Sequence, residues 1–317
     1  MWLGVFYGVA GCALWGLIYI IPLLLPSYDP ISLAMSRFAV FGAASLVMIY
    51  CFRRYLGQFT LRDWLWAFCL SFFGNAVYYA FLTQGIRMAG VPTSGMLMAL
   101  IPLNVALLSN RAGNGIVLPW KKLIPPLLLI LLGLWVGNIE EFSMVRDSMS
   151  ASDYWIGFTF SFISMLLWTW FPIKNGQWLI RHPKVPPVVW TTVQGASIFP
   201  ATLLIFLVMS AERIEAGESL LGPTPRLFIF LLLVAGIACG WGGMALWNLM
   251  SARLPVALSG QMIVFETIFS VIYTLIYRKQ APDWTLVLGL IILLVGVSLS
   301  LKCFRDAEAE HKAKIRS

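Results

Sequence analysis

Apolar residues form long continuous runs along almost the whole chain, and each run is close to the length of a transmembrane helix. Such a helix needs about 20 predominantly apolar residues to cross the hydrocarbon core of a membrane. The runs are continuous rather than alternating, which favours helices over the strands of a membrane barrel. The pattern therefore predicts an all-α integral membrane protein. Its ten predicted spans are about 3–24, 30–52, 63–83, 91–110, 119–138, 154–174, 187–210, 226–249, 255–277 and 283–303.

The connections between the runs are short and carry proline or glycine, which punctuate helices. The two longest connections lie near 139–153 and 211–225, and both are too short to form a domain. The first run has no basic residues before it and no small-residue cleavage site after it. Residues 1–24 are therefore expected to remain as the first helix rather than to be removed as a signal peptide.

Composition supports a membrane protein and excludes other classes. Hydrophobic residues make up 60% of the 317 residues and charged residues only 11%, too few to cover a soluble fold. A soluble enzyme and a nucleic-acid binder are thereby excluded. The five cysteines contain no CxxC pair, both histidines lie outside the spans, and there is no P-loop. The sequence therefore predicts no metal site and no cofactor.

The distribution of Lys and Arg predicts the orientation, because these residues concentrate in cytoplasmic loops. With the N-terminus in the cytoplasm, 15 of the 22 Lys and Arg residues fall inside, 6 fall outside and Arg37 lies within a span. Both termini are therefore expected to be cytoplasmic. The six outer residues are Arg87, Arg146, Arg213, Arg226, Arg278 and Lys279.

The two halves of the chain resemble each other. The segment from Pro30 to Arg37 matches the segment from Pro187 to Gln194, with a proline seven residues before a polar side chain. Two further matches pair Leu14-Trp15 with Leu167-Trp168, and Ser94-Gly95 with Ser259-Gly260. Each half holds five predicted helices, and a duplicated odd unit must insert its second copy upside down. The sequence therefore predicts two inverted five-helix repeats, with a substrate site at the midplane between them.

The repeat divides the chain into four parts. The first five-helix repeat is expected at 1–138, a periplasmic linker at 139–153, the second repeat at 154–303 and a cytoplasmic tail at 304–317. In the tail, acidic and basic residues four apart predict a short solvated helix.

Glu266 and Arg37 are the two ionisable residues well inside predicted spans. A charge near the middle of a membrane is costly, so each is expected to face the interior, to pair or to be neutral. Glu266 is interpreted as a proton-coupling or substrate-binding carboxyl group, and Arg37 as its partner or as a site for an anionic substrate group. The alternative is a structural role as hydrogen-bonding groups between helices.

Further polar and aromatic residues lie at helical spacing inside the spans and are expected to surround a central cavity formed by helices 1–4 and 6–9. The alternative for each is hydrogen bonding or packing between helices. These candidates are Trp15, Tyr78, Asn104, Gln194, Trp241, Asn248 and Ser259.

The sequence resembles the EamA type of the drug/metabolite transporter superfamily over nearly its whole length. The resemblance rests on Trp15-Gly16, Arg37-Phe38, Val91-Pro92 to Pro102, Leu254 to Gly260, Phe265-Glu266 and Leu288-Gly289 to Gly296. Two departures are Thr267, where the family often has proline, and the segment from Arg111 to Gly115, which lacks the usual Gly-Glu pair. The resemblance implies a multi-pass carrier of a bacterial inner membrane.

The function expected from these features is proton-linked export of small amphipathic metabolites, such as amino acids, related compounds or drugs. An importer of an organic cation or another small solute on the same fold is an alternative. A second alternative is an intramembrane enzyme or a non-transporting scaffold, for which no cluster of catalytic residues is evident. The expected partners are the small-molecule substrate, protons and membrane lipid, without nucleic acid, in a monomer or homodimer.

Overall fold

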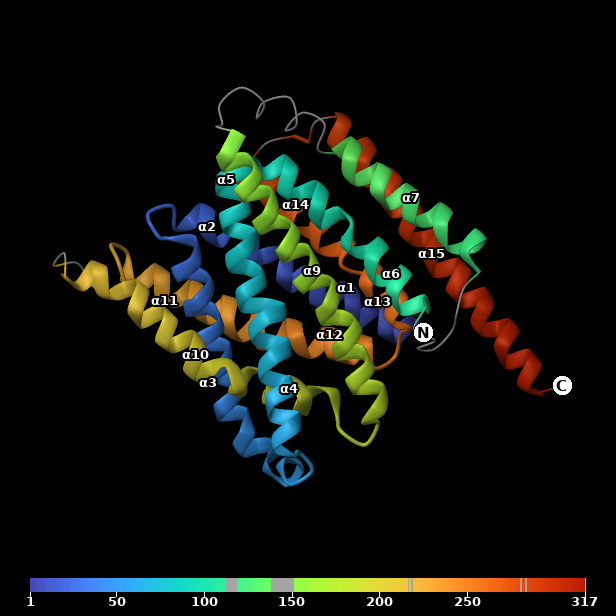
Figure 1. Ribbon diagram of the computed structural model, residues 1–317, viewed down its shortest axis with the longest axis horizontal. Coiled ribbons are helices and arrows are strands. Elements are labelled where there is room, and N and C mark those ends of the chain that lie inside the picture. Colours follow the sequence, from blue (N-terminus) through green and yellow to red (C-terminus); the bar gives the residue numbers. More distant parts are fainter. Residues whose placement is uncertain are drawn as a thin grey trace.

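The structure is a computed structural model that describes residues 1–111, 119–137, 151–215, 217, 219–279, 281–282 and 284–316. All regular elements among these residues are helical (Figure 1). The first half contains α1 (Trp2–Gly16), η1 (Leu17–Tyr19), α2 (Ile21–Leu24), α3 (Pro30–Leu56), α4 (Leu61–Ser71), η2 (Phe72–Val77), α5 (Tyr78–Ala99), α6 (Ile101–Arg111) and α7 (Trp120–Gly137). The second contains α9 (Ala151–Arg181), α10 (Pro187–Glu215), α11 (Pro225–Leu233), η3 (Val234–Gly242), α12 (Gly243–Ser251), α13 (Val256–Gln261), α14 (Val264–Arg278) and α15 (Trp284–Arg316).

Nine helical segments of the described chain are long and apolar enough to cross a membrane. They correspond to nine of the ten spans expected from the sequence. The remaining span, expected at 91–110, is formed by the end of α5 together with α6, and a turn at Leu100 separates these two helices.

The connection expected at 84–90 is helical instead, because α5 continues through it. Here α5 packs closely on α9 through small residues: a Cβ atom on Gly85 would collide with Ser161, and one on Gly157 would collide with Ala89. Such close approach of helices is typical of membrane proteins, where small residues let two backbones meet. The helix therefore persists because this face is buried against α9.

Helices from equivalent places in the two halves pack against each other. The second helix of each half begins with a proline at its first position, and these two helices, α3 and α10, lie in contact. The last helices of the halves, α7 and α15, run side by side at one flank of the bundle (Figure 1). This pairing agrees with the inverted repeat expected from the sequence.

Interruptions of the helices also occur in equivalent places. The third helix of the first half contains the wide turn η2, and the third helix of the second half contains the wide turn η3. The fourth helices are broken as well, at Leu100 between α5 and α6 and at 262–263 between α13 and α14. Wide turns within helices are frequent at functional sites, and paired interruptions in a duplicated carrier indicate where the substrate binds.

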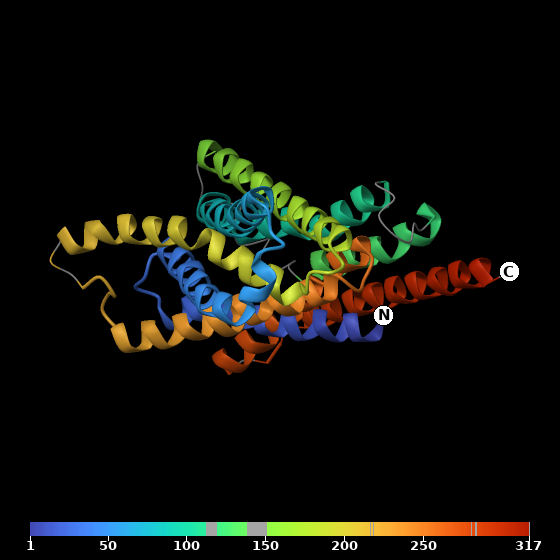
Figure 2. The same ribbon diagram turned by 90° about the horizontal axis from the view of Figure 1, so that it is seen from below.

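The division of the chain into domains stays a prediction, because residues 138–150 of the expected linker lie outside the described part. The expected tail at 304–317 is not a separate helix, since α15 continues without a break to Arg316. Figure 2 shows the end of α15 reaching beyond the N-terminus of α1. Lys122 at the start of α7 pairs with Glu310 near the end of α15 at 3.5 Å.

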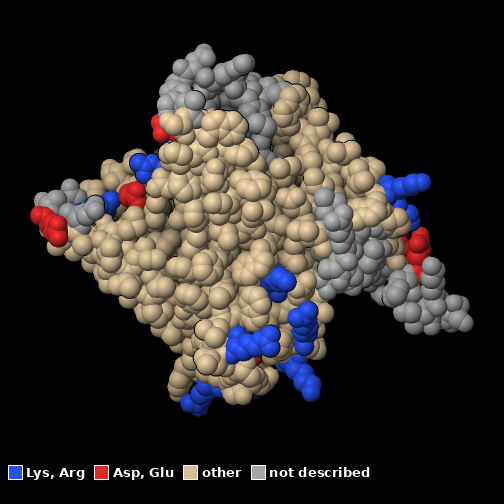
Figure 3. Space-filling view, in the orientation of Figure 1, with Lys and Arg blue, Asp and Glu red and all other residues tan. Residues whose placement is uncertain are grey.

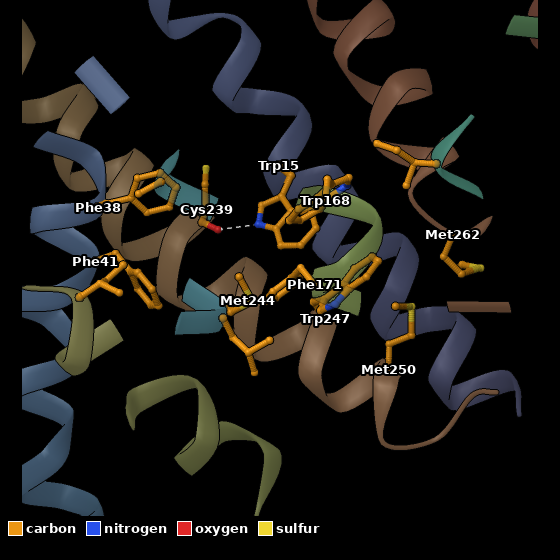
Figure 4. Packing of buried hydrophobic residues seen from close by; sticks show 14 of the residues in the cluster. Trp15, Phe38, Phe41, Trp168, Phe171, Cys239, Met244, Trp247, Met250 and Met262 are labelled. Atoms are coloured by element: carbon orange, nitrogen blue, oxygen red, sulfur yellow. Dashed lines mark hydrogen bonds between the residues drawn. The ribbon is translucent and has the colours of Figure 1, made fainter. Parts of the chain in front are cut away.

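A layer of aromatic side chains fills the middle of the bundle (Figure 4). The ring of Trp15 stacks on Trp247 with centroids 5.2 Å apart and meets Trp168 edge-on at 6.1 Å. Trp168 also stacks on Phe171 at 5.1 Å. The Nε1 of Trp15 donates to the backbone carbonyl of Cys239 in η3 at 2.9 Å. The tryptophans matched by the repeat, Trp15 and Trp168, therefore meet at the centre of the molecule.

Candidate functional site

A cavity of about 310 Å³ lies beside this aromatic layer, where the interrupted helices converge. Its wall is mainly apolar and aromatic, with a few polar groups and one acidic side chain, the balance that is typical of small-molecule sites. The lining residues are Trp15, Ile18, Tyr19, Pro22, Pro30, Arg37, Phe38, Phe41, Asn75, Tyr78, Tyr79, Leu82, Thr83, Ile86, Arg87, Trp168, Cys239, Gly240, Met244 and Glu266.

The cavity opens at one end of the bundle, which we call the mouth end. This is the end where α2 leads into α3, and there Tyr28 donates to the carbonyl of Leu221 at 2.8 Å. Arg87 lines the cavity and its side chain is 59% exposed, so the cavity reaches solvent at this end. The opposite end, where α3 turns into α4 and α9 into α10, is called the basic end.

Irregular backbone places several of the lining residues. Tyr19 is the last residue of the tight turn η1, Asn75 lies within η2, and Gly240 lies within η3. A regular helix would repeat one face every 3.6 residues, whereas a wide or tight turn rotates the following residues to a new face. The lining is therefore a product of these interruptions as much as of helical spacing.

Glu266 lies in the first turn of α14, immediately after the break between α13 and α14. A negative side chain is favoured in the first turn of a helix by the helix dipole. The hydroxyl of Tyr19 donates to Oε1 of Glu266 at 3.0 Å. The carboxyl group thus faces the cavity with one side-chain hydrogen bond and is accessible to a proton or a ligand.

Arg37 approaches the same cavity from α3. Its guanidinium group lies 4.4 Å from the centroid of the Phe38 ring and 5.4 Å from that of Tyr79, within the range of cation–π attraction. No carboxylate of the described residues lies within 4 Å of it. The cavity therefore contains a cation and an acidic group that do not form an ion pair with each other.

The structure brings together four of the nine residues expected at the site: Trp15, Arg37, Tyr78 and Glu266. The ring of Tyr78 stacks on Trp168 with centroids 5.0 Å apart, so it joins the cavity wall to the aromatic layer. The other five expected residues do not line this cavity.

Two of those five, Gln194 and Asn248, belong to a fully buried network with Asn175, Trp190 and Thr191, which we call the amide network. Asn248 receives a bond from Asn175 at 2.7 Å and donates to Gln194 at 2.9 Å and to Thr191 at 2.8 Å. The Oδ1 of Asn175 also accepts from Nε1 of Trp190 at 2.9 Å and from Gln194 at 3.1 Å. The network ties α9, α10 and α12 together between the aromatic layer and the basic end.

The remaining three expected residues lie elsewhere between helices. Trp241 donates to Thr192 at 3.2 Å, and Asn104 to the sulfur of Met165 at 3.5 Å. Ser259 is buried, and its hydroxyl has no hydrogen-bond partner among the described residues.

Sequence reasoning did not select several lining or network residues. Asn175 lies one residue beyond the expected end of its span, so it was assigned to a loop. Tyr79 and Thr83 follow Asn75 at intervals of four, and this helical spacing was the available signal. Trp168 was marked only by its match to Trp15 in the repeat. Within the described residues, no group of three His, Cys, Asp or Glu side chains could hold a metal ion.

Comparisons with known proteins agree with this architecture. The profile of the EamA-like transporter family matches residues 2–139. The chain is 31% identical over 308 residues to the inner membrane protein YtfF of Escherichia coli (strain K12), an alignment that covers 94% of this chain and 95% of YtfF. A crystal structure of another protein, 17% identical in sequence, superposes with a TM-score of 0.73 over 95% of this chain and 98% of its own, which shows the fold alone.

Proposed function

The chain belongs to the EamA-like transporter family of the drug/metabolite transporters, and on that premise we propose that it exports small amphipathic metabolites, amino acids or related compounds, in exchange for protons. The family is one of membrane transporters and not of enzymes. The name of the relative in Escherichia coli supports a location in the inner membrane. Export is proposed from the resemblance to exporters of this family.

The observation that carries the choice of substrate is the pair of opposite ionisable groups in one aromatic cavity. Arg37 and Glu266 both line it, and no ion pair joins them within the described residues. A zwitterion presents a carboxylate and an ammonium group close together. The carboxylate would be bound by Arg37, which has a planar fork of donors, and the ammonium by Glu266. The rings of Trp15 and Tyr78 would contact the apolar side chain.

The two ends of the bundle differ as expected for alternating access, in which a binding site opens to one side of the membrane at a time. The cavity is open at the mouth end. Between the cavity and the basic end lie the aromatic layer, the amide network and the stacked rings of Trp178 and Trp190, whose centroids are 3.5 Å apart. Opening the basic end and closing the mouth end would require the two halves to rock against each other around the cavity.

Proton coupling is proposed to depend on Glu266. A carboxyl group in a cavity that opens alternately to each side can bind a proton on one side and release it on the other. The hydroxyl of Tyr19, 3.0 Å away, would stabilise the ionised form by donating to it.

An organic cation is the second candidate substrate, and the aromatic walls around Glu266 favour it. Trp15, Trp168 and Tyr78 present ring faces that attract cations. The charge of Arg37 in the same cavity opposes a purely cationic substrate, which is why the zwitterion is preferred.

Binding to the purified protein distinguishes the two substrates. Thermal shifts are measured with leucine, with its cationic methyl ester and with its anionic N-acetyl derivative. A zwitterion site is expected to bind leucine more tightly than either derivative, and Arg37→Gln should remove the preference for leucine over the ester. Arg53→Gln, at an exposed position away from the cavity, is the control. Equal or tighter binding of the ester would favour the organic cation, and the absence of any binding would contradict both proposals.

A further inference from the structure

A second pocket, of about 500 Å³, lies at the basic end between the start of α4 and the end of α9. Unlike the cavity of the transport site, it is lined mostly by polar and charged side chains. Its lining residues are Thr60, Arg62, Asp63, Trp66, Leu70, Lys174, Gln177, Trp178, Arg181 and His182. The ring stack of Trp178 on Trp190 and the amide network lie between this pocket and the aromatic layer.

The one acidic residue of the pocket is already bonded within the protein. The carboxylate of Asp63 accepts from the backbone N–H of Thr60 at 2.9 Å, from its hydroxyl at 2.7 Å and from Nε1 of Trp178 at 3.1 Å. The Nε2 of His182 lies 4.0 Å from the same group. These bonds explain why a carboxylate is stable here and leave it little capacity to bind the surrounding cations.

Three cations of the pocket have no such partner. Arg62, Lys174 and Arg181 make no ion pair within 4 Å with any carboxylate of the described chain. Like charges that converge on one pocket repel each other, so their arrangement is favourable when an anion lies between them. Arg side chains bind phosphate oxygens through two parallel bonds, and the amide of Gln177 adds an uncharged donor.

We propose that this pocket binds a phosphate-bearing anion, and that the headgroup of an anionic phospholipid is its occupant. The pocket lies at the ends of two membrane-length helices, at the depth where headgroups lie. Apolar side chains flank it towards the lipid: Leu61 is 76% exposed, Leu65 57% and Ile180 50%. An acyl chain can lie along these residues while the phosphate occupies the pocket. A soluble organic phosphate has the same recognition chemistry but would make no use of this apolar flank.

Lysine and arginine cover the basic end more generally, as Figure 3 shows at the lower edge of the molecule. A diffuse positive surface would attract anionic lipid without a defined site, so the test must separate these effects. Arg53, Arg54 and Lys184 are exposed at the same end and do not line the pocket. They allow a control variant that loses the same number of charges.

The experiment measures the thermal stability of the full chain in neutral detergent as phosphatidylglycerol is titrated, with phosphatidylcholine as the neutral lipid. A second arm uses sodium phosphate and glycerol 3-phosphate against sodium chloride at equal ionic strength. Attraction to an anionic lipid surface gives about a fivefold gain in affinity per Lys or Arg, and a cation that bonds the phosphate directly should contribute at least this much. Arg62→Gln, Lys174→Gln and Arg181→Gln together should therefore weaken binding of phosphatidylglycerol roughly 100-fold. Arg53→Gln, Arg54→Gln and Lys184→Gln together should have a much smaller effect.

The possible outcomes decide the proposal. Loss of phosphatidylglycerol binding in the pocket variant alone supports the site. If sodium phosphate or glycerol 3-phosphate stabilises the protein with equal potency, and the pocket variant loses this effect as well, the occupant is a free phosphate compound and not a lipid. Equal loss in both triple variants would overturn the proposal, because a diffuse surface charge would then explain it. Stabilisation by neither phosphatidylglycerol nor phosphate would also overturn it. If the triple pocket variant does not fold, Arg62→Gln and Arg181→Gln singly should each weaken binding about fivefold.

Discussion

At the scale of single residues, the two charges of the cavity show how position determines the role of a side chain. Arg37 and its counterpart in the repeat, Gln194, both lie seven residues after a proline that starts a helix. Arg37 reaches the cavity, whereas Gln194 is fully buried in the amide network. Equivalent positions in the two halves thus serve different purposes: one is available to a ligand and the other holds three helices together.

Replacing Glu266 by glutamine is expected to abolish transport driven by a pH gradient, because the amide has nearly the same volume but cannot carry a proton. The variant should fold, since Glu266 lies partly open to the cavity and has one side-chain hydrogen bond. Exchange of substrate across proteoliposomes without a gradient should partly survive. The measurement is radiolabelled substrate flux with and without an imposed gradient.

Tyr19→Phe is the companion variant, because it removes the one hydroxyl that donates to Glu266. It should keep coupled transport but change its pH dependence.

If Glu266→Gln carries out coupled transport with an unaltered rate and pH dependence, Glu266 is structural and the proposed mechanism is wrong.

Asn248→Ala is expected to destabilise the protein by about 1–3 kcal/mol, because it leaves buried polar partners without a hydrogen bond. Asn248 makes three of the bonds in the amide network, to Asn175, Thr191 and Gln194. Ser259→Ala is the matched control: this buried hydroxyl has no partner among the described residues, so its removal should cost little. Unfolding in detergent compares the two. Equal stability of both variants would show that the network does not stabilise the fold.

At the scale of helices, the interruptions determine the site more than the helices do. The wide turns η2 and η3 and the break before α14 occur where Asn75, Gly240 and Glu266 reach the cavity. By contrast, α7 and α15 contribute no residue to the cavity lining and pack on each other. The outer pair therefore supports the bundle while the inner helices form the cavity.

The contact between α7 and α15 depends on glycines at the crossing point. A Cβ atom on Gly289 would lie 2.5 Å from the backbone nitrogen of Gly137 and 2.6 Å from the carbonyl oxygen of Gly133, so the helices would have to separate. Gly289→Ala is expected to cost about 1–3 kcal/mol of stability, as overpacking does in well-packed interiors. Substrate binding per folded molecule should be unchanged.

Gly137→Ala is the control for that substitution. It adds the same methyl group to the same helix pair, but the nearest atom to its Cβ lies 3.8 Å away, an ordinary contact distance. Its stability, measured by thermal unfolding in detergent, should stay close to that of the parent protein. If Gly289→Ala were equally harmless, close packing at this crossing would not be a requirement of the fold.

At the scale of the whole molecule, the proposed orientation and the mouth of the cavity are testable together. We expect the basic end to be cytoplasmic and the mouth end periplasmic, because Lys and Arg concentrate in cytoplasmic loops. Single cysteines at the exposed positions 87, 184 and 226 are introduced into a variant without the native five. A membrane-impermeant thiol reagent added to intact cells should label positions 87 and 226, and position 184 only after permeabilisation.

The reverse pattern, with position 184 labelled in intact cells, would overturn the orientation. Labelling at 226 without labelling at 87 would mean that the mouth of the cavity is closed in the membrane. Substrate should slow the reaction at position 87 but leave that at 226 unchanged, since Arg87 lines the cavity and Arg226 does not.

The class of fold, nearly all of the membrane-length helices and the duplication follow from the pattern of amino acids alone. The physical reason is that a segment in lipid must satisfy its backbone hydrogen bonds internally, so a long apolar run has few alternatives to a helix. For the same reason a charge such as Glu266 stood out within its span. Of the nine residues expected at the site, four line the cavity, and two of these four, Glu266 and Arg37, are the charged ones.

The choice of polar side chains that face the cavity, and of those that bond to one another, depends on how the helices pack in the folded chain. Periodicity of 3.6 residues assigns a face only along an unbroken helix, and the turns at 17–19, 72–77 and 234–242 change that face without a clear signature in the sequence. A buried amide such as Asn248 is also equally suited to a ligand and to a neighbouring helix. Its role was determined by Asn175, which lies 73 residues away in the chain and 2.7 Å away in the fold.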